Sequence, residues 1–253
     1  MDAERSFIEK RLSELAEQSV TENRFRFSEF LSMYERSIFH EMERELSYAE
    51  PVVFGGCEDA ERCMVRFGIE DQCGYSEAFP ISILEIRPAM EKYAGDLTHR
   101  DYLGSILGLG LERTKIGDIY IKDHQACVFV NESVESYILT NLMYVGRTKV
   151  KTARLSVLPE SLKPVLSERS VLVSSNRIDS VIAKLYGLSR DEALRLVKNG
   201  QVFIGGRQIN KNAANLQPGQ IISVRGHGRF VFDGEGSKSR KDKLYVNLRV
   251  YGK

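Results

Sequence analysis

One stretch near the C-terminal end restricts local structure more than any other part of the chain. It reads LSRDEALRLVKNGQVFIGGRQI and covers residues 188–209. Ser189 followed by Glu192 makes the S-x-x-E capping box that starts a helix, and Gly200 supplies the left-handed residue that ends one. The glycine pair that follows allows a tight turn between two strands, because glycine accepts positive φ. We therefore predict a capped helix, a glycine stop and a β-hairpin.

A second short helix precedes this stretch. The segment NRIDSVIAKLYG, residues 176–187, carries apolar residues at helical spacing and ends in Gly187. Beyond the hairpin, LQPGQ turns into the strand IISVRG, and GRFVF continues the sheet. The tail GEGSKSRKDKLYVNLRVYGK, residues 234–253, forms either a final strand with a basic loop or a flexible arm that binds phosphate. The pattern predicts two helices packed on a small sheet.

This order of caps and turns resembles the S4 domain, an RNA-binding module named after a protein of the small ribosomal subunit. The resemblance covers about residues 176–232 and rests on RID, LSR, LVKNGQVFIGGRQI and LQPGQIISVRG. It implies that the helix pair and the strand after it form a surface that faces RNA.

The charge of the chain is divided unevenly along its length. Residues 1–75 contain 9 Lys and Arg against 17 Asp and Glu, a net charge of −8, and residues 76–165 are neutral with 11 of each. Residues 166–253 contain 16 against 7, a net charge of +9. A basic third within a chain of net charge +1 indicates a local site for a polyanion.

The candidate RNA contacts in this basic third are cations, polar groups and a glycine that lie off the apolar stripe of the helices or in the turns. They are Arg177, Ser189, Arg190, Lys198, Asn199, Gly200, Arg207, Lys211, Arg225 and Arg229. The alternative is that these groups are merely solvated, and Asp191 with Arg195 does have the spacing of a helical ion pair. Asp179 is expected to orient Arg177 or to cap the helix rather than to do chemistry.

The middle of the chain has a regular order of elements. Strands are expected at FPISILEIRP, KIGDIYI, ACVFV and RTKVKTARLSV, and helices at THRDYLGSILGLG and SVESYILTNLMYV, with Thr98 and Ser133 as their N-caps. Asp101 completes a capping box with Thr98. The resulting order β-α-β-β-α-β is the ferredoxin-like plan that RRM-like RNA-binding domains share. The aromatic platform of such domains is poorly represented, since Phe129 is the only aromatic residue in ACVFV.

The fold class predicted from these patterns is α+β, in three domains and a linker. Residues 1–75 form a mainly helical or mixed N-terminal domain, in which PVVFGGCEDAERCMVRFG reads as a strand, a glycine turn and a helix. Residues 76–156 form the ferredoxin-like domain, residues 157–175 a linker, and residues 176–253 the S4-type domain with its basic tail.

Three further motifs extend the resemblance to nearly the whole chain. They are VVFGGCEDAER, THRDYLGSILGLGLERTKIGDI and NLMYVGRTKV, and with the S4 unit they resemble the bacterial YlmH family. The resemblance implies binding to rRNA of the large ribosomal subunit that carries stalled peptidyl-tRNA, in ribosome-associated quality control. It also makes Arg100 and Arg113 candidate RNA contacts of the central domain. The alternative there is a capping network, in which Arg113 pairs with Glu112 or Asp118.

No catalytic or metal-binding pattern accompanies these motifs. The four cysteines, at 57, 63, 73 and 127, form no CxxC pair, so we expect neither a metal nor a cofactor. The N-terminus lacks a secretory signal and no apolar run is long enough for a membrane helix. We therefore expect a cytoplasmic, non-enzymatic RNA-binding factor, monomeric off the ribosome, with no small-molecule substrate. An RNA-modifying enzyme, an rRNA assembly factor and a cell-division adaptor remain as alternatives.

Overall fold

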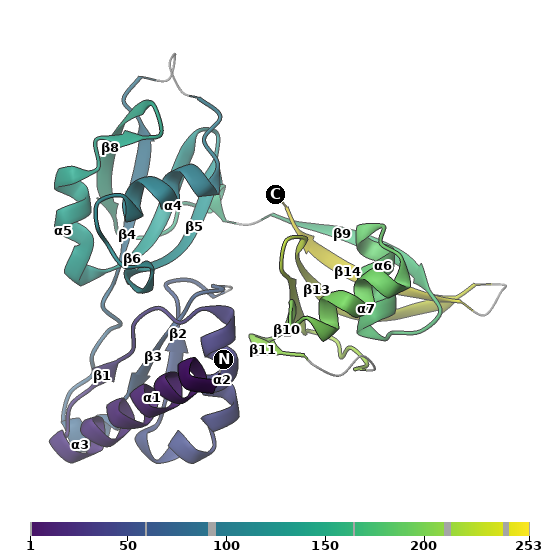
Figure 1. Ribbon diagram of the computed structural model, residues 1–253, viewed down its shortest axis with the longest axis horizontal. Coiled ribbons are helices and arrows are strands. Elements are labelled where there is room, and N and C mark those ends of the chain that lie inside the picture. Colours follow the sequence, from purple (N-terminus) through teal and green to yellow (C-terminus); the bar gives the residue numbers. More distant parts are fainter. Residues whose placement is uncertain are drawn as a thin grey trace. The chain divides into compact units, whose positions relative to one another are not determined.

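The computed structural model describes residues 2–58, 60–90, 95–163, 165–209, 214–239 and 243–252. The chain divides into two compact units, Met1–Lys163 and Pro164–Lys253 (Figure 1). The described residues form three antiparallel sheets with helices packed on them. The α+β class is therefore confirmed.

The first part of unit 1 combines helices with a small sheet. Helices α1 (Asp2–Glu22) and α2 (Met33–Met42) and the 3-10 helix η1 (Glu45–Ala49) pack against a sheet of order β1-β3-β2. These strands are β1 (Arg26–Phe27), β2 (Val52–Phe54) and β3 (Met64–Phe67), and the short helix α3 (Glu70–Cys73) follows. The helix predicted in ERCMVRFG is wrong, because that segment forms β3. Both faces of β3 are buried, so its sequence shows no alternation by which a strand could be recognised.

The second part of unit 1 is a five-stranded sheet of order β5-β6-β4-β8-β7. Its elements run β4 (Ile81–Pro88), α4 (His99–Leu107), η3 (Arg113–Lys115), β5 (Ile116–Lys122), β6 (Gln125–Asn131), α5 (Glu132–Asn141), β7 (Tyr144–Val145) and β8 (Thr148–Leu155). The predicted order β-α-β-β-α-β is present, with β7 added before the last strand. Both helices cover one face of the sheet, where they pack on Leu84, Val128 and Val150 (Figure 1).

The predicted N-cap is correct for α4 and wrong for α5. The Thr98 backbone N–H and hydroxyl both donate to the Asp101 carboxylate, at 2.8 and 2.6 Å, as expected. The N-cap of α5 is Asn131 and not Ser133, because the Asn131 side chain accepts a hydrogen bond of 2.9 Å from the Ser133 backbone N–H. The predicted continuation of this helix to residue 145 is also wrong, since residues 144–145 form β7.

The other face of the central sheet is covered over much of its area by residues from outside the sheet. Phe129 on β6 is fully buried there, against Phe30 and Met64 from the first part of the unit and Leu162 from η4 (Glu160–Leu162). Residues on either side of the predicted boundary at 75 therefore share one core, and both lie in the same compact unit. The division of the chain into three domains stays a prediction.

Arg62 connects the two parts of unit 1 by hydrogen bonds. Its Nε donates to the Ile116 carbonyl at 2.9 Å, and its Nη2 donates to the carbonyls of Phe30 at 2.7 Å and Arg113 at 3.3 Å. The Arg62 and Glu61 backbone N–H groups both donate to the Asp118 carboxylate. Desolvation of the guanidinium lowers the pKa of Arg62, which is the expected effect of burying a charge.

We expect Arg62→Met to lower the free energy of unfolding of unit 1 by about 2 kcal/mol, because Met fills the same space but removes the Arg62 donors from the carbonyl oxygens of Phe30 and Arg113. The melting temperature should fall by about 4–8 °C, which scanning calorimetry measures. The control is Arg24→Met, because Arg24 is exposed. It should change stability by less than about 0.5 kcal/mol. Equal melting temperatures for the two variants would contradict a connecting role for Arg62.

Unit 2 is a six-stranded sheet of order β11-β10-β12-β13-β14-β9 with two helices on one face. Its elements are β9 (Leu166–Val173), α6 (Ile178–Tyr186), α7 (Arg190–Lys198), β10 (Val202–Ile204), β11 (Arg207–Gln208), β12 (Ile221–Val224), β13 (Gly228–Lys238) and β14 (Leu244–Tyr251). The linker predicted at 157–175 is wrong for residues 166–173, since β9 pairs with β14 along its whole length. Of the two alternatives for the tail, the final strand is correct for residues 244–251.

The stops and caps of the opening stretch are as predicted. The Ser189 hydroxyl accepts a hydrogen bond from the Glu192 backbone N–H at 3.2 Å, and the Glu192 carboxylate accepts one from the Ser189 N–H at 2.8 Å. Gly187 and Gly200 end the two helices with φ of 67° and 65°. A Cβ on Gly200 would lie 2.2 Å from Nε2 of Gln208, so this position requires glycine for space as well as for conformation.

Candidate nucleic-acid interface

A buried carboxylate anchors the basic surface at the start of the two helices of unit 2. The Asp179 side chain is fully buried in the first turn of α6. Arg177 donates to it twice, from Nε at 3.0 Å and from Nη2 at 3.3 Å, and Arg190 donates from Nε at 3.2 Å. The predicted orientation of Arg177 by Asp179 is confirmed. The pairing of Asp179 with Arg190 was not foreseen.

Both arginines remain accessible while they hold this carboxylate. The exposed fraction of the side chain is 34% for Arg177 and 57% for Arg190. A buried carboxylate is costly unless it is paired, and two charge-assisted hydrogen-bond partners offset that cost. Because guanidinium is planar and carries five N–H donors, fixing one edge of it also fixes the direction of the rest. Asp179 therefore sets two outward cations in defined positions, Arg177 at the N-cap of α6 and Arg190 at the start of α7.

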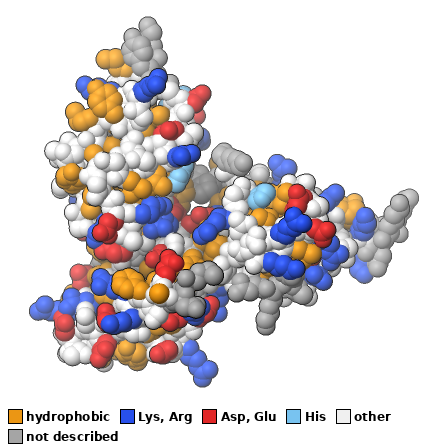
Figure 2. All heavy atoms as spheres, in the orientation of Figure 1, with side chains coloured by type: hydrophobic (Ala, Val, Ile, Leu, Met, Phe, Trp, Pro, Cys, Tyr) orange, Lys and Arg blue, Asp and Glu red, His pale blue; other side chains and the backbone are white. Residues whose placement is uncertain are grey.

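A second group of candidates lies at the other end of α7. Lys198 and Asn199 are exposed there, and Arg207 is exposed on the neighbouring hairpin. Gln208 Nε2 donates to the Gly200 carbonyl at 2.9 Å, which ties the hairpin to the end of the helix. Figure 2 shows this helical side of unit 2, with several Lys and Arg side chains (blue) and fewer Asp and Glu side chains (red) around α7. The geometry suits a phosphate backbone that runs along α7.

Two other candidates lie on the opposite face of the same sheet. The Arg225 guanidinium carbon is 5.8 Å from the centre of the Phe203 ring, and that of Arg229 is 4.5 Å from the centre of the Tyr251 ring. Phe203 lies between two β10 residues that pack against the helices, so its side chain points to the other face. The structure therefore does not bring Arg225 and Arg229 together with Arg177 and Arg190. The remaining candidate of this unit, Lys211, lies outside the described residues.

The two candidates of the central part have different surroundings. Arg100 is exposed on the first turn of α4. Arg113 is partly buried, and its Nη1 donates to the carbonyls of Ile116 and Gly117 in its own turn. Burial, followed by the positive charge of Arg62, lowers the pKa of Arg113 to about 10, so it stays charged at neutral pH. The contacts of Arg113 thus favour a structural role, whereas those of Arg100 are compatible with RNA binding.

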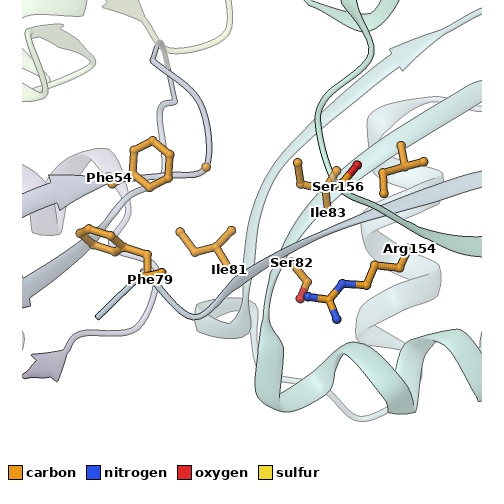
Figure 3. A pocket seen from close by; sticks show the side chains of 10 residues that line it. Phe54, Phe79, Ile81, Ser82, Ile83, Arg154 and Ser156 are labelled. Atoms are coloured by element: carbon orange, nitrogen blue, oxygen red, sulfur yellow. The ribbon is translucent and has the colours of Figure 1, made fainter. Parts of the chain in front are cut away.

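Unit 1 also has a hollow of about 780 Å³ beside the start of β4. The rings of Phe54 and Phe79, whose centres are 5.4 Å apart, form one wall, and Ile83 and Arg154 lie on the other (Figure 3). Arg154 is paired with carboxylates of α5, including Glu135 at 3.5 Å. The hollow therefore combines apolar rings with the polar side chains of Ser82, Ser156 and Arg154, and these carboxylates offset the charge of Arg154.

Two further kinds of structural feature are a metal site and a membrane-spanning helix. Among the residues that the structure describes, no group of three or more His, Cys, Asp or Glu could hold a metal ion. Within the same ranges, none of the helices has the length and apolar character needed to cross a membrane.

Comparison with family models assigns both RNA-related regions. Residues 75–158 match the model described as "Putative RNA-binding domain in YlmH", and residues 176–222 match the S4 domain. With the basic, capped helix pair described above, these matches define the chain as an RNA-binding protein with a C-terminal S4 domain. The combination of the two domains is that of the YlmH family, and the chain belongs to it.

Individual relatives match different shares of the chain. The chain is 28% identical over 195 residues to the ribosome-associated protein quality control protein P2 of Bacillus subtilis, which covers 77% of this chain and 75% of the relative. It is 34% identical over 61 residues to the small ribosomal subunit protein uS4 of Dictyoglomus thermophilum. That match covers only 24% of this chain and 30% of uS4. Among solved structures, the cell division protein ylmH from Streptococcus pneumoniae aligns with 63% of this chain and 94% of its own, at a TM-score of 0.49 and 19% identity.

Proposed function

We propose that this chain is a non-catalytic factor that binds rRNA and tRNA on the large ribosomal subunit and acts in the quality control of stalled translation. The observation that carries the proposal is the pair of arginines held outward by buried Asp179 on an S4 domain. The name of the Bacillus subtilis relative, which places that protein in ribosome-associated quality control, supports the same process for this chain.

The central part is proposed to be a ferredoxin-like RNA-binding domain. Without β7, its strands have the order β5-β6-β4-β8, and every neighbouring pair is antiparallel. In that arrangement the first and third strands of a β-α-β-β-α-β chain lie side by side in the middle of the sheet, which is the ferredoxin-like plan. The match to the YlmH RNA-binding domain over residues 75–158 supports an RNA ligand for it.

The proposal also names the contact residues, the ligands and the location of the protein. RNA contacts are proposed at Arg177, Arg190, Lys198, Asn199, Arg207 and Arg100, whose side chains are at least partly exposed. Large-subunit rRNA and peptidyl-tRNA are the proposed ligands, with a cytoplasmic location and no small-molecule substrate. Because this surface reads shape and phosphate rather than bases, binding should depend strongly on salt.

Sedimentation with purified ribosomal particles tests the proposal. The full chain is mixed with large subunits that carry peptidyl-tRNA, with vacant large subunits, and with small subunits as the control. We expect the chain to sediment with the large subunit, more of it when peptidyl-tRNA is present, and to be released as salt increases from 50 to 200 mM. If the chain stays at the top of the gradient with large subunits at 50 mM salt, the proposed function is wrong.

A further inference from the structure

The central sheet has two faces, and only part of one face is open. Along β8, Val150 packs under the helices, so its neighbours Lys149 and Lys151 point to the opposite face. That opposite face is the one that Phe30, Met64 and η4 cover around Phe129. The cover ends before the far end of the sheet, where the side chains of β8 alternate between buried and exposed. An RRM-like domain would stack bases at the centre of this face, and here the centre is closed.

A row of cations crosses the uncovered end of this face. Arg87 on β4 lies opposite Lys151 on β8, and Lys149 on β8 lies opposite Tyr144 on β7. Each of these residues alternates with a neighbour that packs under the helices, so all four side chains leave the sheet on the same side. Lys122 on β5, which follows Ile121 of the helical face, extends the row to the far edge of the sheet.

The row is exposed and has a net positive charge. The exposed fraction is 56% for the Arg87 side chain and 55% for Tyr144, and the lysines are exposed as well. One carboxylate of the same face, Glu85, lies 3.7 Å from Arg87 and offsets part of its charge. Asp123, in the turn after Lys122, is exposed beside it. Among the residues that the structure describes, Lys149 and Lys151 form no ion pair with a carboxylate.

Tyr144 gives this surface a feature that a merely solvated group of charges lacks. Its ring is more than half exposed, whereas Phe129, at the centre of the same face, is fully buried. An exposed ring beside cations is the combination that binds single-stranded nucleic acid, because the ring stacks on a base while the cations hold the backbone. The cross-strand pairing places Lys149 directly beside Tyr144.

We infer that the uncovered end of the central sheet binds single-stranded RNA, with an unpaired base stacked on Tyr144 and the backbone held by Lys149 and Lys151. The inference rests on the proposed function, since both take RNA as the ligand. It names the surface of the central part that takes RNA and the class of RNA, single-stranded, that this surface fits. RNA would bind at the edge of the sheet, because Phe30, Met64 and η4 cover the centre of this face.

Binding of two probes to the full chain tests this inference by fluorescence anisotropy. The probes are a 12-nucleotide oligouridine and a 12-base-pair RNA duplex. Tyr144→Ala should weaken binding of the oligouridine about tenfold, leave the duplex unchanged, and be rescued in Tyr144→Phe, which keeps the ring. Lys149→Gln with Lys151→Gln should lower the slope of log K against log salt for the oligouridine by about 1.4, at about 0.7 per lost phosphate contact.

Matched controls separate this inference from the proposed function. Lys10→Gln with Arg44→Gln removes the same charge from exposed positions in the first part of unit 1 and should change neither slope nor affinity. The S4 variant Arg190→Gln with Lys198→Gln is measured in parallel. If that variant loses RNA binding while the Tyr144 and Lys149–Lys151 variants match the unaltered chain, this inference is wrong and the proposed function stands. If the unaltered chain does not bind the oligouridine at 50 mM salt, this inference is wrong, whereas the proposed function is decided by sedimentation with the ribosomal subunits.

Discussion

The variant Arg190→Gln with Lys198→Glu is expected to bind RNA about 100-fold more weakly at 0.1 M salt, with unit 2 still folded. Each phosphate contact contributes about 0.7–0.9 log units of affinity at that salt, and the variant removes two cations and adds an anion. Lys198 is exposed, so its reversal to Glu should cost little stability. Anisotropy with structured RNA at several salt concentrations gives both the affinity and the salt slope, which should fall by about 2.

The choice of Gln at position 190 follows from the buried carboxylate. A glutamate at position 190 would stand where Arg190 now donates to Asp179 at 3.2 Å, and the two carboxylates would repel each other beside the core. Glutamine keeps a hydrogen-bond donor at that position without the charge. Loss of RNA binding in this variant therefore reports on the surface and not on unfolding.

The control for this variant is Lys10→Glu with Arg24→Gln, which changes the net charge by the same amount in the acidic first part of the chain. Both side chains are exposed there. We expect its affinity to stay within about twofold of the unaltered chain, since neither side chain belongs to the proposed surface. Equal losses in both variants would show that RNA responds only to total charge, and the proposed surface would be wrong.

Features that depend on a few neighbouring residues could be predicted from the sequence. The capping boxes at Ser189 and Thr98 and the left-handed glycines at 187 and 200 are of this kind. Their hydrogen bonds join residues three or four apart, so the residue types and spacing already contain the geometry. The order of strands and helices in the central part follows from the same local periodicity.

Features that depend on distant partners could not be predicted. The sequence at β3 indicates a helix because both faces of the strand are buried and its residues do not alternate. The sequence of residues 166–173 indicates a linker because the partner strand, β14, begins about 70 residues later, at Leu244. The hydrogen bond between Arg190 and Asp179 spans eleven positions, and those of Arg62 to the central part span more than fifty. The spacing of residues in the sequence does not indicate contacts of this kind.

Contacts between residues distant in the chain also decide which candidate site residues lie on one surface. The sequence placed Arg225 and Arg229 in the same basic surface as Arg190, because a net charge has no direction. The alternation of β10, β12 and β13 puts them on the face opposite the helices. The sequence also indicated that the aromatic platform was weak, yet only the packing around Phe129 shows that the platform is closed and that Tyr144 is open.

The variant Asp179→Asn is expected to weaken RNA binding about fivefold even though it makes the protein more positive. Simple attraction predicts the opposite sign, because removing a negative charge near phosphate should strengthen binding. The buried position of Asp179 makes its direct effect on phosphate small, whereas its hydrogen bonds to Arg177 and Arg190 fix where both guanidinium groups lie. Releasing them restores rotamer freedom that must be lost again on binding, at about 0.5–1.5 kcal/mol for each side chain.

The same substitution should also lower the free energy of unfolding of unit 2 by about 3 kcal/mol, the lower end of the cost of breaking a buried ion pair. The lower end applies because both arginines remain partly exposed and can be solvated when their partner is lost. Affinity is therefore measured well below the melting temperature, where both the variant and the unaltered chain are folded by circular dichroism.

A double-mutant cycle distinguishes positioning from a purely structural role. If Asp179 acts on RNA through Arg190, Asp179→Asn should weaken binding less in the Arg190→Gln background than in the unaltered chain, leaving only the share that acts through Arg177. The loss of stability supplies a second, independent readout for each variant. If Asp179→Asn strengthens RNA binding, its buried carboxylate serves the fold alone. If it weakens binding equally in both backgrounds, Asp179 does not position Arg190 for RNA, and its effect runs through Arg177.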